Sequence, residues 1–450
     1  MNHLFKYFTL AAALLLCSLL ARPCVAAGAG AVADDGVLTL QRAIELAQKN
    51  NPTMQGVRAQ TEAAHGDVVR ARSAFLPRIE AGGGIEYDFK KPGFLIKPGT
   101  VGNPTSLGIQ VSDQTVPKVQ VGVEQTIYDF GRSTNRYREA TAGERAHLYE
   151  EQLFSQDLAL AVTQVYLDVL LAREAVTTAT AVEEAYQEHM RTAKKLFESG
   201  SVPRNDMLGA EVALSRAELN RSAAENQRTL VEMNFEKMIG APADNIDRRT
   251  MSDNPKIKAA GDAKDSAKQN RIELAINEEQ QKIARAQKAR ANSEYLPHVV
   301  AQAQAIYADD SFQLNKDQYR LMAGLRWPIF DGLAAYGAKK KAAAELAATE
   351  FGRQALLDKI DVEVERATLD LSQSRDSLDV ANKNRAKTSE NLRSMRERYA
   401  SGDAPASDVI DAIAMWNVAS LDYIQALHDI NLSAARLKRA EGKEITGDDR

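Results

Sequence analysis

The chain has 450 residues, enough for two or three domains of ordinary size. Its composition, 44% hydrophobic, 26% charged and 6% aromatic, argues against low-complexity disorder and against a bundle of transmembrane helices. The formal net charge of −4 argues against a globally basic nucleic-acid-binding protein, so no nucleic-acid partner is expected.

The first 27 residues are predicted to be an export signal peptide. Lys6 provides a positive start, residues 8–21 form an apolar core too short to span a bilayer comfortably, and residues 25–27 are small enough for cleavage. We expect cleavage after residue 27, with cleavage after Ala33 as the alternative.

Both cysteines of the chain, Cys17 and Cys24, lie within this segment. A lipoprotein is disfavoured because each follows Leu16 or Pro23 rather than a small residue. The mature chain therefore has no thiol, disulfide or thiolate metal site. No later segment is apolar over the length of a membrane-spanning helix.

The rest of the chain contains an internal duplication. Residues 196–206 align with 398–408 at an offset of 202, and both contain Ser-Gly-x-x-Pro-x-x-Asp. Residues 73–77 align with 293–297 at an offset of 220. The difference of 18 residues between the two offsets falls in a Pro/Gly-rich loop of the first copy, residues 90–116. This loop is longer than its counterpart in the second copy.

Each copy is predicted to contain the same elements in the same order. A helix ending at a Leu-Pro pair is followed by two strands of period-2 alternation, a long helix and a shorter helix. At 1.5 Å per residue the long helix would run about 100 Å, and the two shorter helices stacked end to end would nearly match it. The expected ranges are 51–76, 79–89, 119–127, 132–199 and 203–239 in the first copy and 271–296, 299–307, 319–329, 334–401 and 405–441 in the second.

The four strands fit a transmembrane β-barrel, whose strands need about 9 to 11 residues. A soluble sheet packed on one face is the alternative, but the signal peptide and the aromatic residues near the strand ends favour the barrel. Four strands cannot close a barrel and lipid does not tolerate an open edge, so several chains must contribute. A conducting pore favours three chains and 12 strands over two chains and eight. The aromatic residues are Tyr87, Phe89, Tyr128, Phe130, Trp327 and Phe330.

This order of elements resembles the TolC-type outer-membrane efflux proteins over residues 37–441. The motifs that carry the resemblance are Leu38-Thr-Leu-Gln-Arg-Ala-Ile-Glu-Leu-Ala47 with Asn50-Asn-Pro52, Gln125-Thr-Ile-Tyr-Asp-Phe-Gly131, Trp327-Pro-Ile-Phe-Asp-Gly332 and Gly402-Asp-Ala-Pro-Ala-Ser-Asp-Val-Ile-Asp411. The resemblance implies an α+β membrane protein of the outer membrane of a Gram-negative bacterium, extending into the periplasm. It implies a homotrimer with a 12-stranded β-barrel, four strands per chain, continued by a long α-helical barrel.

The predicted domains follow the duplication. The boundaries are a signal peptide at 1–27, an N-terminal equatorial segment at 28–50, the first repeat at 51–239, a linker and equatorial segment at 240–270, the second repeat at 271–441 and a polar tail at 442–450.

The resemblance also implies a function, that of an exit duct in a tripartite efflux or type I secretion system. The implied partners are outer-membrane lipid, a periplasmic adaptor and an inner-membrane ABC or proton-driven transporter. No metal, cofactor or catalytic motif is expected, and the energy for transport would come from the pump. The alternative is a periplasmic coiled-coil adaptor or scaffold without a pore, which would not need four paired strands.

Asp408 and Asp411 are the candidate channel constriction. They lie three apart and share a helix face, so three chains would place six carboxylates around the axis and form a cation-binding gate. The plainer interpretation is that Asp408 is a helix-start acid and Asp411 its solvated neighbour. The resemblance favours the gate, because the constriction aspartates of the family fall on these two positions.

The resemblance further implies links between the two copies that lock the closed end. Asp206 and Tyr399 match one such pair, an acceptor and a phenol donor. The second link departs from the family, since Ala404 stands where an arginine is common, opposite Asn205. Arg204 is a candidate replacement, and a solvated turn arginine is the alternative.

Overall fold

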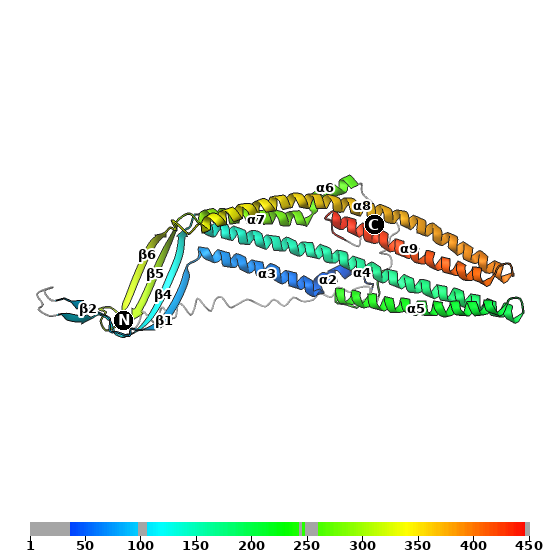
Figure 1. Ribbon diagram of the computed structural model, residues 1–450, viewed down its shortest axis with the longest axis horizontal. Helices are drawn as coiled ribbons and strands as arrows, with labels where there is room; N and C mark the ends of the chain where they lie inside the picture. The colour runs from blue at the N-terminus through cyan, green and yellow to red at the C-terminus, as the bar shows by residue number, and fades with distance from the viewer. Residues whose placement is uncertain (1–36, 98–105, 243–244, 248–259, 446–450) are drawn as a thin grey trace. The chain divides into compact units, whose positions relative to one another are not determined.

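The computed structural model describes residues 37–97, 106–242, 245–247 and 260–445 (Figure 1). The predicted signal peptide lies outside the described residues. The elements are, in chain order, α2 (Leu40–Asn50), α3 (Pro52–Arg72), a 3-10 turn (Ser73–Phe75), β1 (Arg78–Tyr87), β2 (Gly93–Ile96), β3 (Leu107–Gln110), β4 (Thr115–Tyr128), α4 (Arg132–Glu198), α5 (Arg204–Ile239), α6 (Ala260–Asn270), α7 (Ile272–Ser293), β5 (His298–Ala308), β6 (Asp317–Arg326), α8 (Ala334–Ala400) and α9 (Ala406–Ala440).

The order of elements confirms the predicted duplication. Elements α3, β1, β4, α4 and α5 are followed by α7, β5, β6, α8 and α9, and α4 and α8 both have 67 residues. Local signals start and stop these helices. Asn51 caps α3 by accepting hydrogen bonds from the backbone N–H groups of Thr53 and Met54, and Pro52 occupies the first turn, where no N–H is needed. The first helix of each copy ends a few residues before its Leu-Pro pair, as expected for a helix stopped by proline.

Strands β1, β4, β5 and β6 form one antiparallel sheet in that order (Figure 1). One row across it joins Ala81, Val121, Ala305 and Tyr319, and the adjacent row joins Glu80, Gly122, Gln304 and Arg320. The rows alternate between apolar and polar because successive side chains of a strand point to opposite faces. The predicted alternation is therefore confirmed across the whole sheet, whose two edges are β1 and β6.

The segment expected to be a plain loop, residues 90–116, contains a short hairpin. Phe94 of β2 pairs with Ile109 of β3, because both strands are short apolar stretches. The loops of the two copies are tied together beside it. The buried Asp310 carboxylate accepts hydrogen bonds from the Ser112 hydroxyl (2.7 Å) and from the backbone N–H of Asp113 (3.0 Å).

Most of the packing between helices involves the two long helices, α4 and α8. Helix α4 contacts α3 and α5 of its own copy, and α8 contacts α7 and α9. Helix α4 also contacts α7 and α9, so it joins the two copies. The centre of the first core is Tyr166, whose ring meets Phe235 edge-on at 5.8 Å, and the second core centres on Ile360, Leu371 and Ile430. No helix among the described residues combines the length and apolarity that a bilayer crossing requires.

The two shorter helices of each copy meet end to end, as their lengths predict, and we call each meeting point a joint. In the first joint Gly240 follows α5 with φ of 66°, and a Cβ there would lie 2.8 Å from Asn50 Cβ. In the second joint Gly442 follows α9 with φ of 73°, and a Cβ would lie 2.7 Å from the Asn270 carbonyl carbon. Only glycine allows this conformation and this approach without strain. The two glycines are related by the offset of 202, and the two asparagines by that of 220.

The joints differ in their polar contacts. In the first, the Asn50 amide donates to the Ile239 carbonyl (3.1 Å) and the Asn51 amide to the Met238 carbonyl (3.4 Å). In the second, Arg271 occupies the position that matches Asn51, and its guanidinium donates to the Ala440 carbonyl (3.3 Å). A side chain at the start of one helix thus satisfies the last carbonyls of another.

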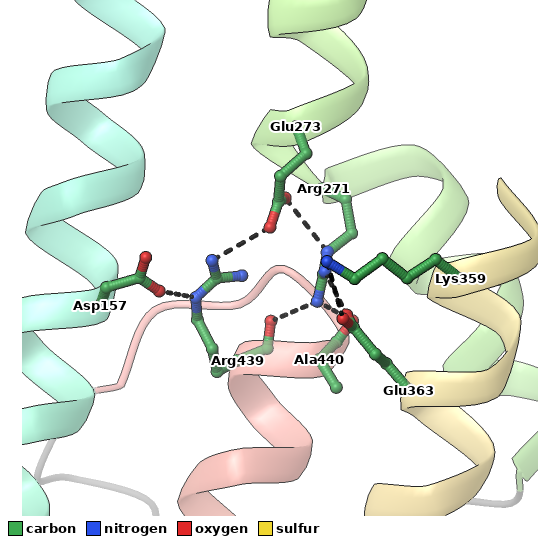
Figure 2. Close-up of polar contacts among 7 residues, drawn as sticks. All are labelled: Asp157, Arg271, Glu273, Lys359, Glu363, Arg439 and Ala440. Carbon is green, nitrogen blue, oxygen red and sulfur yellow. Dashed lines mark hydrogen bonds and ion pairs between the residues drawn. The ribbon is translucent and has the colours of Figure 1, made fainter. Parts of the chain in front are cut away.

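The second joint adds a network of ion pairs around Arg271 and Arg439 (Figure 2). Arg271 pairs with Glu273 (3.1 Å) and Glu363 (2.6 Å), and Arg439 pairs with Glu273 (3.0 Å) and Asp157 (2.7 Å). Asp157 lies on α4, Glu363 on α8 and Arg439 at the end of α9, and Arg271 and Glu273 lie at the start of α7. The network therefore joins four helices at one place.

Candidate functional site

The candidate site lies where the long helices end, and we call it the tip. It comprises the turns 199–203 and 401–405 and the helix ends that adjoin them. Gly200 and Gly402 end the long helices with positive φ, 76° and 84°, and Pro203 and Pro405 precede the short helices with φ near −70°. Glycine just after the end of one helix and proline at the start of the next are typical of a tight turn between two antiparallel helices.

A shared apolar core joins the two copies at the tip. Val182, Ala185 and Ala193 of α4 pack with Leu392 of α8 and with Val409 of α9, among others. Val409 is fully buried. The tip of one copy is therefore held against the tip of the other by side-chain burial rather than by a backbone connection.

The two aspartates of the predicted gate lie on the first two turns of α9. The Asp408 carboxylate accepts a hydrogen bond from the Ser407 hydroxyl (3.3 Å) and is half-buried, and Asp411 is exposed. Neither forms an ion pair among the described residues. Two accessible, unpaired carboxylates three residues apart can bind a cation or repel each other, as the gate requires.

Asp411 also acts on a tyrosine of the first copy. Burial raises the pKa of Tyr186 on α4, and the Asp411 carboxylate raises it further. The Tyr186 hydroxyl donates to the backbone carbonyl of Ile410 (3.4 Å). The gate helix is therefore in direct contact with α4, a contact that the sequence analysis did not identify.

The predicted lock residues lie at the tip, but the structure brings only two of them near each other. Tyr399 is buried, its hydroxyl has no hydrogen-bond partner among the described residues, and burial followed by the Asp206 charge raises its pKa. Arg204 and Asn205 are exposed, and no described residue forms a side-chain hydrogen bond or ion pair with either. Ala404 is buried, so an arginine at this position would not fit without rearrangement.

His189 on α4 is a tip residue that the sequence analysis missed. It is 4% exposed, and its ring lies 4.9 Å from the Tyr399 ring. The pKa of His189 is lowered to about 4, first by burial and then by the Arg396 charge, with the Asp206 charge opposing the shift. The signal in the sequence is the stripe Val182, Ala185, His189 and Ala193 at helical spacing, in which a histidine stands at an apolar position.

One protein family matches both copies of the chain. The family model described as "Outer membrane efflux protein" matches residues 43–241 and 264–443. These two ranges include most of each predicted repeat and leave out the segment that joins them.

Two characterised relatives have similar sequences. Proteases secretion protein PrtF of Dickeya chrysanthemi is 23% identical over 314 residues, which cover 67% of this chain and 66% of PrtF. Alkaline protease secretion protein AprF of Pseudomonas aeruginosa is 23% identical over 275 residues, which cover 59% of this chain and 55% of AprF. The chain thus spans less than two thirds of the length of either relative.

Solved structures share the fold. The crystal structure of a membrane protein from Pseudomonas aeruginosa superposes with a TM-score of 0.76 at 16% identity. The superposition covers 94% of this chain and 97% of that protein. At this identity the likeness shows the fold alone.

Proposed function

Since this chain belongs to the outer membrane efflux protein family, we propose that it forms the exit channel of a tripartite efflux or type I secretion system. Its place is the outer membrane of a Gram-negative bacterium. The observation that carries the proposal is the family match over most of the chain, together with a four-stranded sheet whose edges are open.

The open edges of the sheet support a ring of several copies. Among the described residues β1 and β6 have no second neighbour, and a bilayer cannot hydrogen-bond their free backbone groups. Pairing β6 of one copy with β1 of the next is a heterologous contact that closes into a ring. We propose three copies, because 12 strands leave an open pore whereas eight are filled by side chains.

The edges of the helical part support the same arrangement. Helix α4 contacts α5 and α9, and α9 contacts α8, so α5 and α8 lie at the edges of this group. Val212 and Leu219 of α5 and Val362 and Leu369 of α8 are exposed, and each pair is seven residues apart. Exposed apolar residues at heptad spacing are typical of helices that pack against another helix. We propose that α8 of one copy packs against α5 of the next.

The gate of the proposed channel is the ring of Asp408 and Asp411 from three copies. The lock comprises Asp206 and Tyr399, with Asn205 and Arg204 as further members on the turn of the first copy. Among the described residues the Tyr399 hydroxyl has no hydrogen-bond partner and the Asp206 charge acts on it, so the phenol is available as a donor to that carboxylate.

We propose a periplasmic adaptor and an inner-membrane ABC or proton-driven transporter as partners. The names of PrtF and AprF favour an unfolded polypeptide as cargo, and the efflux family favours small molecules. The predicted domain boundaries, with repeats at 51–239 and 271–441, are retained as part of this proposal.

The proposal is tested with the mature protein purified in detergent and reconstituted in planar bilayers. We expect three chains per particle by light scattering, recovery from outer-membrane fractions, and small cation-selective channels that a trivalent cation blocks. Replacing Asp408 and Asp411 by Asn should raise the conductance and raise the half-blocking concentration about tenfold, equivalent to about 1.4 kcal/mol.

Asp422→Asn is the matched control, since Asp422 is an exposed aspartate farther along the same helix. It should leave both the conductance and the block unchanged. Recovery of a soluble monomer would reject the channel and favour the scaffold alternative. Normal block in the double variant would reject the aspartates as the gate while leaving the channel intact.

A further inference from the structure

His189 and Tyr399 place two buried polar atoms without partners at the tip. Neither His189 Nε2 nor the Tyr399 hydroxyl has a hydrogen-bond partner among the described residues. The two rings come from different copies and lie 4.9 Å apart at an angle of 54°. Buried polar groups are almost always hydrogen-bonded. These two atoms therefore lose hydrogen bonds to water when the copies pack together and gain none in return.

The apolar surroundings of His189 come from all four helices of the tip. Ala185 and Ala193 flank it on α4, and Ala210 of α5, Leu392 of α8 and Val409 of α9 belong to the same core. Water is excluded from this core while the copies are packed together. A protonated imidazole in this position would be desolvated without an acceptor for Nε2.

The charges that act on the imidazole come from two helices and oppose each other. Arg396 of α8 disfavours a proton on His189, and Asp206 of α5 favours it. Arg396 is itself paired with the exposed Glu188 of α4 (3.6 Å), and α9 faces the core with apolar side chains. Burial outweighs both charges, so the neutral imidazole is the form that fits the packed tip.

We propose that His189 is a third member of the lock between the two copies, and that protonation of its imidazole releases the tip. This inference rests on the proposed function, since it assigns a role at the gate of the channel. The histidine acts through packing and charge rather than by contacting cargo, which makes it a positioning residue of the gate.

The direction of the effect follows from linkage. The pKa of His189 is about 4 in the packed tip and 6.5 when the imidazole is in water. A group whose pKa is lowered by packing opposes packing as the pH falls below 6.5, because the separated state then binds the proton. Between pH 7.5 and pH 5.5 the separated state should gain about tenfold per chain. The response should therefore be visible before most carboxylates titrate.

The test compares single-channel open probability at pH 7.5 and pH 5.5 for the full mature trimer in planar bilayers. We use the Asp408→Asn, Asp411→Asn background so that the gate carboxylates do not titrate. We expect opening to rise reversibly about tenfold or more at pH 5.5 with His189 present. His189→Gln, which keeps a polar side chain but cannot be protonated, should remove the rise.

His147→Gln is the matched control, because His147 lies on the same helix but is half-exposed and paired with Glu150. It should retain the full response. The inference is overturned if His189→Gln keeps the rise, or if the channel with His189 shows no rise at all. Absence of channels at both pH values would instead reject the proposed function itself.

A second measurement covers the case in which His189→Gln does not assemble. Histidine carbon-13 NMR in detergent of the protein with His298→Gln, which removes the other described imidazole whose pKa is lowered, should show one imidazole that remains neutral down to about pH 4. Titration of every histidine near its ordinary value would contradict the buried lock.

Discussion

The second joint and the tip are both places where helices of different segments meet around buried polar side chains, yet their chemistry is opposite. At the joint each charged side chain has an ion-pair partner, and Arg271 contacts two carboxylates and the last carbonyls of α9 (Figure 2). At the tip the buried His189 and Tyr399 each leave a polar atom without a partner among the described residues. Every charge at the joint is in an ion pair, although Arg271 Nε, Glu273 Oε2 and Arg439 Nη1 form no hydrogen bond among the described residues. At the tip, His189 Nε2 and the Tyr399 hydroxyl have neither an ion pair nor a hydrogen bond within the described part of the chain.

The difference teaches which contacts are built to persist. Opening the joint would separate each charge from its partner, and the side chains of Arg271 and Arg439 are largely buried, so the joint resists opening. Separating the tip returns two unsatisfied groups to water, so these two groups favour separation. Apolar burial, with the long Tyr186–Ile410 and Arg396–Glu188 contacts, holds the tip together. This arrangement suits a channel that opens at the tip and stays rigid at the joint.

Removing Arg271 should have the largest effect. Arg271→Met removes one of the two cations that pair with Glu273 and with Glu363 and leaves the last carbonyls of α9 without their donor, and we expect a loss of about 2–3 kcal/mol in the free energy of unfolding. Urea unfolding in detergent, followed by circular dichroism, measures this loss. Arg366→Met is the control, since Arg366 is exposed and its pairing with Asp370 is long (3.8 Å), and we expect about 0.5 kcal/mol or less. Equal losses would show that the joint is not a special site.

Two glycines compare the backbone of the same regions. Gly442 at the joint and Gly402 at the tip both have positive φ, but only Gly442 approaches another backbone segment. Alanine should cost about 1–2 kcal/mol at Gly402 from conformation alone, and more at Gly442 because a Cβ would meet the backbone of Asn270. Thermal unfolding of the two variants measures the difference. A smaller cost at Gly442 than at Gly402 would contradict the close contact.

His428 extends the comparison along α9, between the tip and the joint. Its two ring nitrogens each lie 2.9 Å from a carboxylate, Asp168 of α4 and Asp429 of α9. Burial acts to lower the pKa of His428, but the hydrogen bonds to the two aspartates outweigh it and raise the pKa above 6.5. This is opposite to His189, although both histidines are buried.

A raised pKa contributes stability that is fully present below pH 6.5 and is lost as the pH rises through the higher value of the folded protein. We therefore expect His428 to contribute less to the melting temperature at pH 8.5 than at pH 6. His428→Gln should remove most of this dependence and cost about 1 kcal/mol at pH 6. Thermal scans at the two pH values check it, and an unchanged slope in the variant would assign the dependence to other groups.

Tyr399→Phe should have the smallest effect. Because the hydroxyl has no partner, its removal should change the stability of the tip by less than about 1 kcal/mol. Open probability in bilayers is the sensitive measure. A large increase in opening would mean that the assembled trimer forms the Tyr399–Asp206 hydrogen bond of the proposed lock. The tip would then differ from the joint in having a hydrogen bond where Arg271 has ion pairs.

Much of the fold was predictable because its signals are local and repeated. Alternation in 79–87 and 299–307 predicted strands, and two Ser-Gly-x-x-Pro turns at one offset predicted where the long helices end. The hairpin β2–β3 was missed because each of its strands has only four residues, too few for a period to appear. The two aspartates proposed as the gate were identified through the family motif, and both lie on the first two turns of α9.

The sequence by itself determined the order of elements, the duplication and the family, because periodicity, turn residues and motifs act over short stretches of chain. Only the tertiary structure decided that Arg271 would meet Arg439 and Glu363, and that His189 would face Tyr399, 210 positions away. Such contacts depend on how α4 packs against α8 and α9, which no local pattern specifies. The partners of a buried imidazole then decide its chemistry, since hydrogen bonds to Asp168 and Asp429 raise the pKa of His428 whereas burial beside Tyr399 lowers that of His189.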